Sequence, residues 1–157
     1  MEAWRIPRGQ KECFSIRTPE QIRWEWVKSW LDKANEDLFA AEVILASKAR
    51  AVDTAAFHAQ QAAEKALKAL LIRHQLRFGK THDIEELLEL AQPAAPGISS
   101  ELAEAARLTL YAVDVRYPGE EPVRREVAGH ALAVARRVVE SVIARLRPYL
   151  DAGRPGS

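Results

Sequence analysis

An alanine-rich stretch at residues 57–71 constrains the fold more than any other part of this chain. With about 100° between successive residues of an α-helix, one side of this stretch carries only small or apolar side chains. They are Ala59, Ala63, Ala66 and Leu70. Because small side chains let another helix approach closely, this face predicts a tight helix–helix contact.

The segments before and after this stretch have the spacing of amphipathic bundle helices. Thr18, Pro19 and Gln21 provide a cap, a first-turn proline and the distal residue of a capping box, so a helix is predicted from Pro19 to about Ser47. Its apolar residues recur at steps of four and three: Val27, Leu31, Ala34, Leu38, Ala41 and Leu45. The same spacing predicts a last helix over 123–147, through Ala128, Leu132, Ala135, Val139, Val142 and Leu146.

Turn and cap residues define the remaining elements. Asp53 is a candidate cap for a second helix that runs to about Leu76, before Gly79. Thr81 is a candidate cap for a short helix over 83–90. A further helix is predicted from Ser99 or Ser100, with one face made of Leu102, Ala106, Thr109 and Val113. The fold class is therefore all-α: an antiparallel up-down bundle of four long helices plus one short helix.

Length and composition indicate one domain. A chain of 157 residues with 48% hydrophobic residues and few glycines fits one helical core. Residues 1–18 are predicted to form an N-terminal arm, 19–150 the helical bundle and 151–157 a disordered tail.

The charge balance and the single cysteine restrict the classes of function. The net charge is +1, so the strongly basic surface expected of a general nucleic-acid binder is absent. Cys13 has no partner for an internal disulfide, and no apolar run approaches the roughly 20 residues of a membrane span. We expect a cytoplasmic protein with no membrane association, and no motif indicates a metal or an organic cofactor.

The stretch at 57–71 also carries a polar stripe opposite its alanines. Gln61, Glu64 and Lys68 lie along one face, with His58 and Lys65 beside them. Facing a groove, these side chains would bind a phosphate and a base edge. Facing solvent, they would form an ordinary salt-bridged helix surface, since Glu64 and Lys68 are an i, i+4 ion pair.

Four motifs occur in the order found in a known family. They are residues 30–38, WLDKANEDL; residues 57–71; residues 81–88, THDIEELL; and Tyr111 followed by Arg116, Tyr117 and Pro118. Together they resemble the HEPN family, helical domains of higher eukaryotes and prokaryotes associated with nucleotides and RNA. The resemblance covers residues 24–150 and implies a helical bundle that often dimerises. Many relatives are encoded beside a minimal nucleotidyltransferase, and some are metal-independent ribonuclease toxins.

For the ribonuclease members, the resemblance implies a site made from an arginine and a histidine separated by four to six residues. Arg125 and His130 fit this spacing and are the candidate catalytic pair, but Arg124 with His130 and Arg77 with His82 fit it as well. Histidine would move the proton of the ribose hydroxyl, and arginine would stabilise the phosphorane charge. Because five residues rotate a helix by about 140°, the pair does not converge within one subunit.

Two further candidate ligand residues fall in predicted turns at the ends of the bundle. Arg116 is a candidate phosphate clamp, with pairing to Asp114 or Glu120 as its structural alternative. His82 either binds a ligand or fixes its turn onto the bundle.

The leading hypothesis is a nucleotide-binding protein that works with a minimal nucleotidyltransferase in a toxin–antitoxin-like module. The alternatives are a metal-independent ribonuclease toxin that uses Arg125 and His130 across a dimer, and a non-catalytic helical scaffold. Trp26, Trp30 and Ile44 lie beside the main apolar stripe of the first helix, which predicts a homodimer.

Overall fold

The computed structural model describes residues 16–112 and 121–156. Every regular element in these two ranges is helical. The predictions for residues 1–15, including Cys13, and those for Arg116 and Tyr117 lie outside the described residues.

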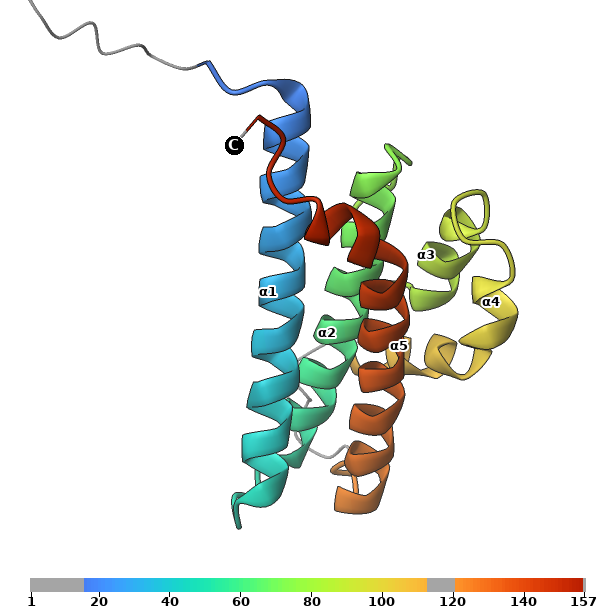
Figure 1. Ribbon diagram of the computed structural model, residues 1–157. Coiled ribbons are helices and arrows are strands. Elements are labelled where there is room, and N and C mark those ends of the chain that lie inside the picture. The colour runs from blue at the N-terminus through green and yellow to red at the C-terminus, as the bar shows by residue number, and fades with distance from the viewer. Residues whose placement is uncertain (1–15, 113–120, 157) are drawn as a thin grey trace, which may run out of the picture.

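Three long helices form the body of the molecule (Figure 1). They are α1 (Pro19–Ala46), α2 (Val52–Arg73) and α5 (Arg125–Asp151). The first runs antiparallel to the other two, and α2 packs against both of them (Figure 1). Because α2 also contacts α3 (Ile84–Ala91) and the 3-10 helix η1 (Ala103–Tyr111), it is the central helix of the fold.

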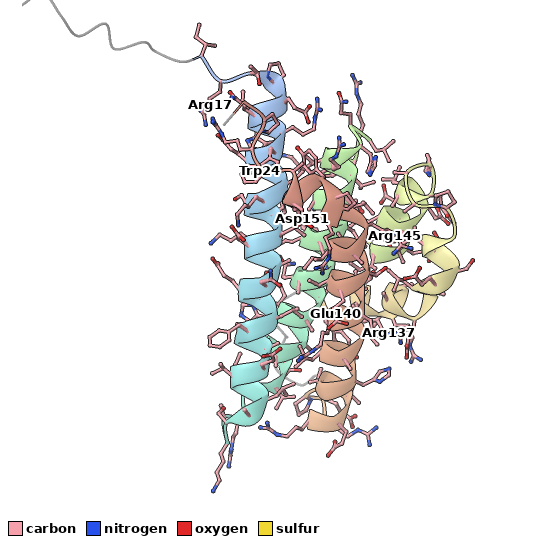
Figure 2. The ribbon with its side chains drawn as sticks, viewed as in Figure 1. Arg17, Trp24, Arg137, Glu140, Arg145 and Asp151 are labelled. Carbon is pink, nitrogen blue, oxygen red and sulfur yellow. The ribbon has the colours of Figure 1, made fainter. Side chains whose placement is uncertain are left out.

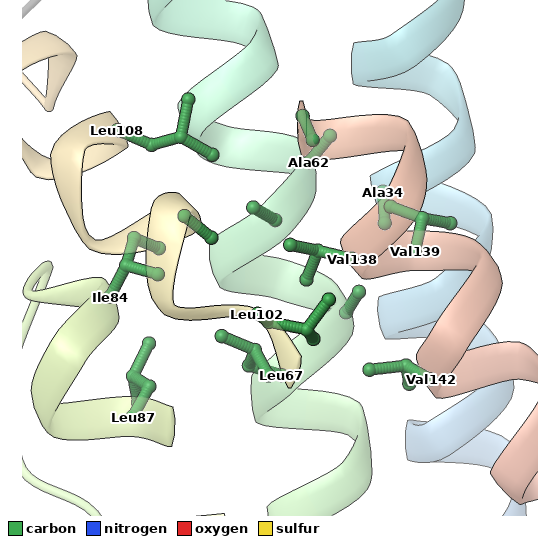
Figure 3. Packing of buried hydrophobic residues seen from close by; sticks show 14 of the residues in the cluster. Ala34, Ala62, Leu67, Ile84, Leu87, Leu102, Leu108, Val138, Val139 and Val142 are labelled. Carbon is green, nitrogen blue, oxygen red and sulfur yellow. The ribbon is translucent and has the colours of Figure 1, made fainter. Parts of the chain in front are cut away.

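The alanine seam of α2 is buried as its spacing predicts. Ala59, Ala63, Ala66 and Leu70 are all 0% exposed. The stripe of α5 is likewise buried, and that of α1 is buried from Val27 to Ala41, with Leu45 only partly covered. Figure 3 shows how Ala62 and Leu67 of α2 lie among Ala34 of α1 and Val138 and Val139 of α5.

The capping box at the start of α1 is confirmed. Thr18 Oγ1 accepts a hydrogen bond from the Gln21 backbone N–H, and the Gln21 side chain accepts one from the Thr18 backbone N–H. Two donors that the helix leaves unpaired at its first turn are thereby satisfied.

Three short elements pack against one side of the long helices: α3 (Ile84–Ala91), α4 (Ile98–Glu101) and a 3-10 helix, η1 (Ala103–Tyr111). The prediction of a fourth long α-helix is wrong, because α4 ends after four residues and the chain continues as η1. In η1 the buried residues are Ala105 and Leu108, and they follow the buried Leu102 at its N-cap. Their spacing of three matches the three residues per turn of a 3-10 helix, so one face of η1 stays on the core.

Two predicted caps also differ from the structure. Asp53 does not cap α2; its Oδ1 accepts a hydrogen bond from the Val123 backbone N–H at 2.8 Å. The cap of α3 is Asp83, which accepts from two backbone N–H groups, while Thr81 Oγ1 accepts from the Asp83 backbone N–H. No side chain caps α2, whereas at α3 the neighbouring Asp83 takes the role predicted for Thr81.

The C-terminal segment, expected to be disordered, contacts α1 over its described residues. Gln21 Nε2 donates to the Pro155 carbonyl at 2.8 Å, and Arg154 Nε donates to Glu25 at 2.9 Å.

Within residues 16–112 and 121–156, no helix combines the length and apolarity that a bilayer crossing requires.

Candidate functional site

The predicted polar stripe of α2 forms a hydrogen-bonded network that is largely buried. We call Gln60, Gln61, Glu64, Lys68 and His82 the α2 network. Glu64 lies at its centre: Oε1 accepts from Lys68 Nζ at 2.7 Å and Oε2 accepts from Gln60 Nε2 at 2.8 Å. His82 Nδ1 lies 3.1 Å from Glu64 Oε2, and Gln61 Nε2 donates to Gln60 Oε1 at 2.8 Å.

The position of the central residues explains why they pair with one another. Gln60, Glu64 and Lys68 lie at i, i+4 and i+8, so they follow one another along a single face of α2. Gln60 is 0% exposed, Glu64 3% and Lys68 7%. A charge buried this deeply needs a partner, which each member provides for the next.

The carboxylate of Glu64 stays ionised within this network. Burial alone raises its pKa, but the hydrogen bonds from Lys68 and Gln60, with the charge of Lys68, outweigh burial and lower the pKa below its ordinary value. The ammonium of Lys68 also lies 5.9 Å from the ring centre of Trp30 and 5.7 Å from that of Phe78. Aromatic faces therefore supply further electrostatic stabilisation of this buried cation.

A second cluster joins α1 to α2. Asp37 of α1, buried at 8% exposure, lies with Oδ1 2.8 Å from His58 Nδ1. Its other oxygen accepts a hydrogen bond from Lys65 Nζ. The buried carboxylate of Asp37 therefore holds both His58 and Lys65, which the predicted stripe had placed side by side.

Four members of the two clusters reach solvent, and one of them is the partly buried Gln61. The side chain of His82 is 64% exposed, that of His58 28% and that of Lys65 23%. Their partners lie below them in the bundle, which restricts their rotamers. A ligand can therefore touch His58, Gln61 and Lys65 of the predicted stripe, and His82 beside them, whereas Lys68 lies inside.

The candidate pair Arg125 and His130 is not brought together. Arg125 donates from Nη1 to the Leu45 carbonyl and from Nη2 to the Ala49 carbonyl, each at 2.7 Å, at the C-terminal end of α1. His130 Nε2 instead lies 2.7 Å from Glu104 Oε1 of η1. Within one subunit, the arginine serves as a helix cap and the histidine belongs to a different cluster.

The neighbours of Glu104 complete that cluster. Arg137 Nη1 donates to Glu104 Oε2 at 3.0 Å. The hydrogen bond from His130, and secondarily Arg137, lowers the pKa of Glu104. Arg137 and Arg145 lie along one edge of α5 (Figure 2), and Arg145 donates to Glu101 of α4. Ion pairs therefore join this edge of α5 to α4 and η1.

Sequence reasoning missed three residues that hold these clusters together: Asp37, Gln60 and Glu104. Asp37 stood inside the motif at residues 30–38, but only burial distinguishes it from Glu36 beside it. Gln60 precedes the stripe by one position, and its hydrogen bond to the His82 carbonyl required the fold. The predicted site residue Arg116 lies outside the described residues.

Among the described residues, no three histidine, cysteine or acidic side chains gather in an arrangement that could hold a metal ion.

The protein is a helical bundle. Its central helix carries an alanine seam on one face and a buried polar network on another. The chain matches the HEPN domain family over residues 27–146 and belongs to it.

Two solved structures are similar to it. The protein TT1696 from Thermus thermophilus shares 32% sequence identity with a TM-score of 0.64, over 76% of this chain and 98% of that one. The archaeal HEPN homologue ST0689 shares 26% identity with a TM-score of 0.61, over 76% of this chain and 97% of that one. No curated protein matches the chain.

Proposed function

We propose that this HEPN-domain protein binds a nucleotide, or a phosphate group of RNA, and works with a minimal nucleotidyltransferase in a toxin–antitoxin-like module. The observation that carries the proposal is the solvent boundary of the two polar clusters. His58, Lys65 and His82 meet solvent there while buried carboxylates hold them in place. Preorganised donors of this kind bind a phosphate at low entropic cost.

The contacts within the two clusters separate the residues proposed to bind a phosphate from those proposed to stabilise the bundle. Lys65 and His82 are the proposed phosphate ligands, with His58 and Gln61 beside them on α2. Asp37 positions Lys65 and Glu64 positions His82, while Lys68 lies beneath and pairs with Glu64. Arg116, which lies outside the described residues, remains a proposed phosphate clamp.

Binding is tested by calorimetric titration of the full chain with the four ribonucleoside triphosphates and with a short single-stranded RNA. The proposal is supported if binding is saturable and if Lys65→Ala and His82→Ala each weaken it about tenfold. That is the loss expected for one charge-assisted hydrogen bond. Lys33→Ala is the matched control, because Lys33 is an exposed lysine of α1 paired with Glu36. Absence of binding to every probe would reject the proposal.

The partner is tested separately. A nucleotidyltransferase reading frame beside the gene, whose product co-purifies with this chain, supports the module. The ribonuclease alternative predicts growth arrest on expression that His130→Ala relieves.

The scaffold is the second candidate function, and one specific observation favours it. Gln60, Glu64 and Lys68 satisfy one another inside the bundle. A network complete without a ligand is what a purely structural role requires. In that case no nucleotide binds, and Lys68→Ala changes only the free energy of unfolding.

A further inference from the structure

A cavity of about 300 Å³ lies between η1 and α5, away from the α2 network. Its walls carry Arg107 and Tyr111 from η1, and Glu126 and His130 from α5. Leu108 and Val134 contribute to its apolar lining and are 2% and 5% exposed. This volume lies at the lower limit of typical small-molecule sites, which combine an apolar lining with a few convergent polar groups.

Among the described residues, only some of the charged side chains on the cavity walls form ion pairs. Glu104 is balanced by His130 and Arg137. In the part of the chain that the structure describes, neither Arg107 nor Glu126 forms an ion pair. One wall therefore offers a cation, and the facing wall an acceptor, with which no described residue forms an ion pair.

The hydrogen bond to Glu104 also prepares His130 for a ligand. Because the carboxylate is an acceptor, the ring donates through Nε2, and the neutral imidazole then carries an acceptor at Nδ1. The ring is fixed at one nitrogen and free at the other.

We propose that this η1–α5 cavity binds a small, flat aromatic anion that also carries an N–H donor. The ring system lies on the apolar lining beside Tyr111, and the anionic group is bound by Arg107. Glu126 or His130 Nδ1 accepts the N–H. Nucleoside monophosphates and indole-type carboxylic acids share this chemistry. The site goes beyond the proposed function, because it shares no residue with the α2 network.

The probe is 1-anilinonaphthalene-8-sulfonate, a flat aromatic anion with an N–H, titrated by fluorescence into the full chain. We expect saturation at one molecule per chain and at least about tenfold weaker binding to Arg107→Gln, the loss expected for one charge-assisted hydrogen bond. Arg147→Gln is the matched control, since Arg147 is an exposed arginine of α5 outside the cavity. Unchanged binding to Arg107→Gln would overturn the proposal.

Ala131→Leu tests the volume, because Ala131 also lines the cavity and a larger side chain occupies part of it. Weaker dye binding at an unchanged melting temperature supports the site, and unchanged dye binding contradicts it. If this variant does not fold, the exposed Arg107→Gln still decides the question.

Displacement of the dye identifies the source of the natural ligand. Displacement by adenosine or guanosine monophosphate assigns the cavity to nucleotides, and displacement by indole-3-acetate assigns it to aromatic acids. If neither displaces the dye at millimolar concentration, the dye binds as an adventitious additive only and the proposal fails. His82→Ala leaves dye binding unchanged, so this result is separable from that of the α2 network.

Discussion

Lys68 Nζ lies 2.7 Å from Glu64 Oε1 inside the bundle, where the two side chains are 8% and 5% exposed. Such a pair depends on both partners, because removing one leaves an uncompensated buried charge. We expect Lys68→Met to lower the free energy of unfolding by about 3–5 kcal/mol, measured by urea denaturation. Lys33→Met, which breaks an exposed pair with Glu36, should change the free energy of unfolding little, because solvent screens that pair.

The double variant Glu64→Leu with Lys68→Met separates charge from packing. Removing both charges together should recover much of the loss, since no unpaired ion remains. If Lys68→Met alone leaves stability unchanged but weakens nucleotide binding, Lys68 is a ligand-binding residue and the network is not its main role.

The lowered pKa of Glu64 gives the stability a defined pH dependence. Because the folded pKa lies below the unfolded one, the stabilisation is complete above the ordinary glutamate pKa of about 4.3 and is lost as the pH falls through the folded value. Urea denaturation of the wild-type chain and of Glu64→Gln, between about pH 6 and about pH 3, measures this contribution. Subtracting the free energy of unfolding of the variant from that of the wild type cancels the contributions of the other carboxylates. We expect a constant difference near the upper end that shrinks below about pH 4.3, and a difference independent of pH would contradict the account.

Most of the fold followed from spacing, and the exception has a physical cause. The rows from Val27 to Ala41 and from Ala128 to Leu146 have the period of an α-helix, and both are buried. Ala105 and Leu108 of η1 continue from Leu102 at its N-cap with a period of three, whereas the predicted row assumed the α-helical period. Over so short a segment, Ala105 and Ala106 are equally good candidates for the core, and only packing distinguishes them.

The sequence predicted which residues form the polar stripe, but not how deeply each of them is buried. The stripe placed Glu64 and Lys68 on one face, yet sequence gives no measure of whether that face meets solvent or Trp30 and Phe78. The bond between His130 and Glu104 joins residues that are 26 positions apart. Such partners depend on tertiary structure, which local spacing does not encode.

Arg125 provides a direct test of its two interpretations. As a cap, it satisfies two backbone carbonyls at the end of α1, so Arg125→Gln should lower the free energy of unfolding by about 1–2 kcal/mol. Arg124→Gln is the matched control, because that neighbouring arginine precedes α5 as an exposed residue. Loss of a ribonuclease activity in Arg125→Gln without any loss of stability would instead support a catalytic role.

The last prediction is a homodimer formed through exposed apolar side chains of α1. Trp26 is 59% exposed, Phe39 67% and Val43 48%. Phe39 and Val43 are i, i+4 neighbours on one face, whereas Trp26 lies about 140° around the helix from Phe39. Trp30 and Ile44, which the sequence placed with Trp26, instead pack against the core. The pair Phe39 and Val43 is therefore the larger contiguous patch and the better candidate interface.

Light scattering at micromolar concentration should give twice the chain mass of 17.6 kDa. Phe39→Glu should shift the equilibrium towards monomer, because a buried carboxylate without a partner opposes association. Trp26→Glu, on the other side of α1, is the matched comparison and should leave the dimer intact. The opposite pattern would move the interface to the Trp26 side. A wild-type chain that is monomeric under these conditions would refute the prediction and exclude any active site shared between two subunits, including one that joins Arg125 of one subunit to His130 of another.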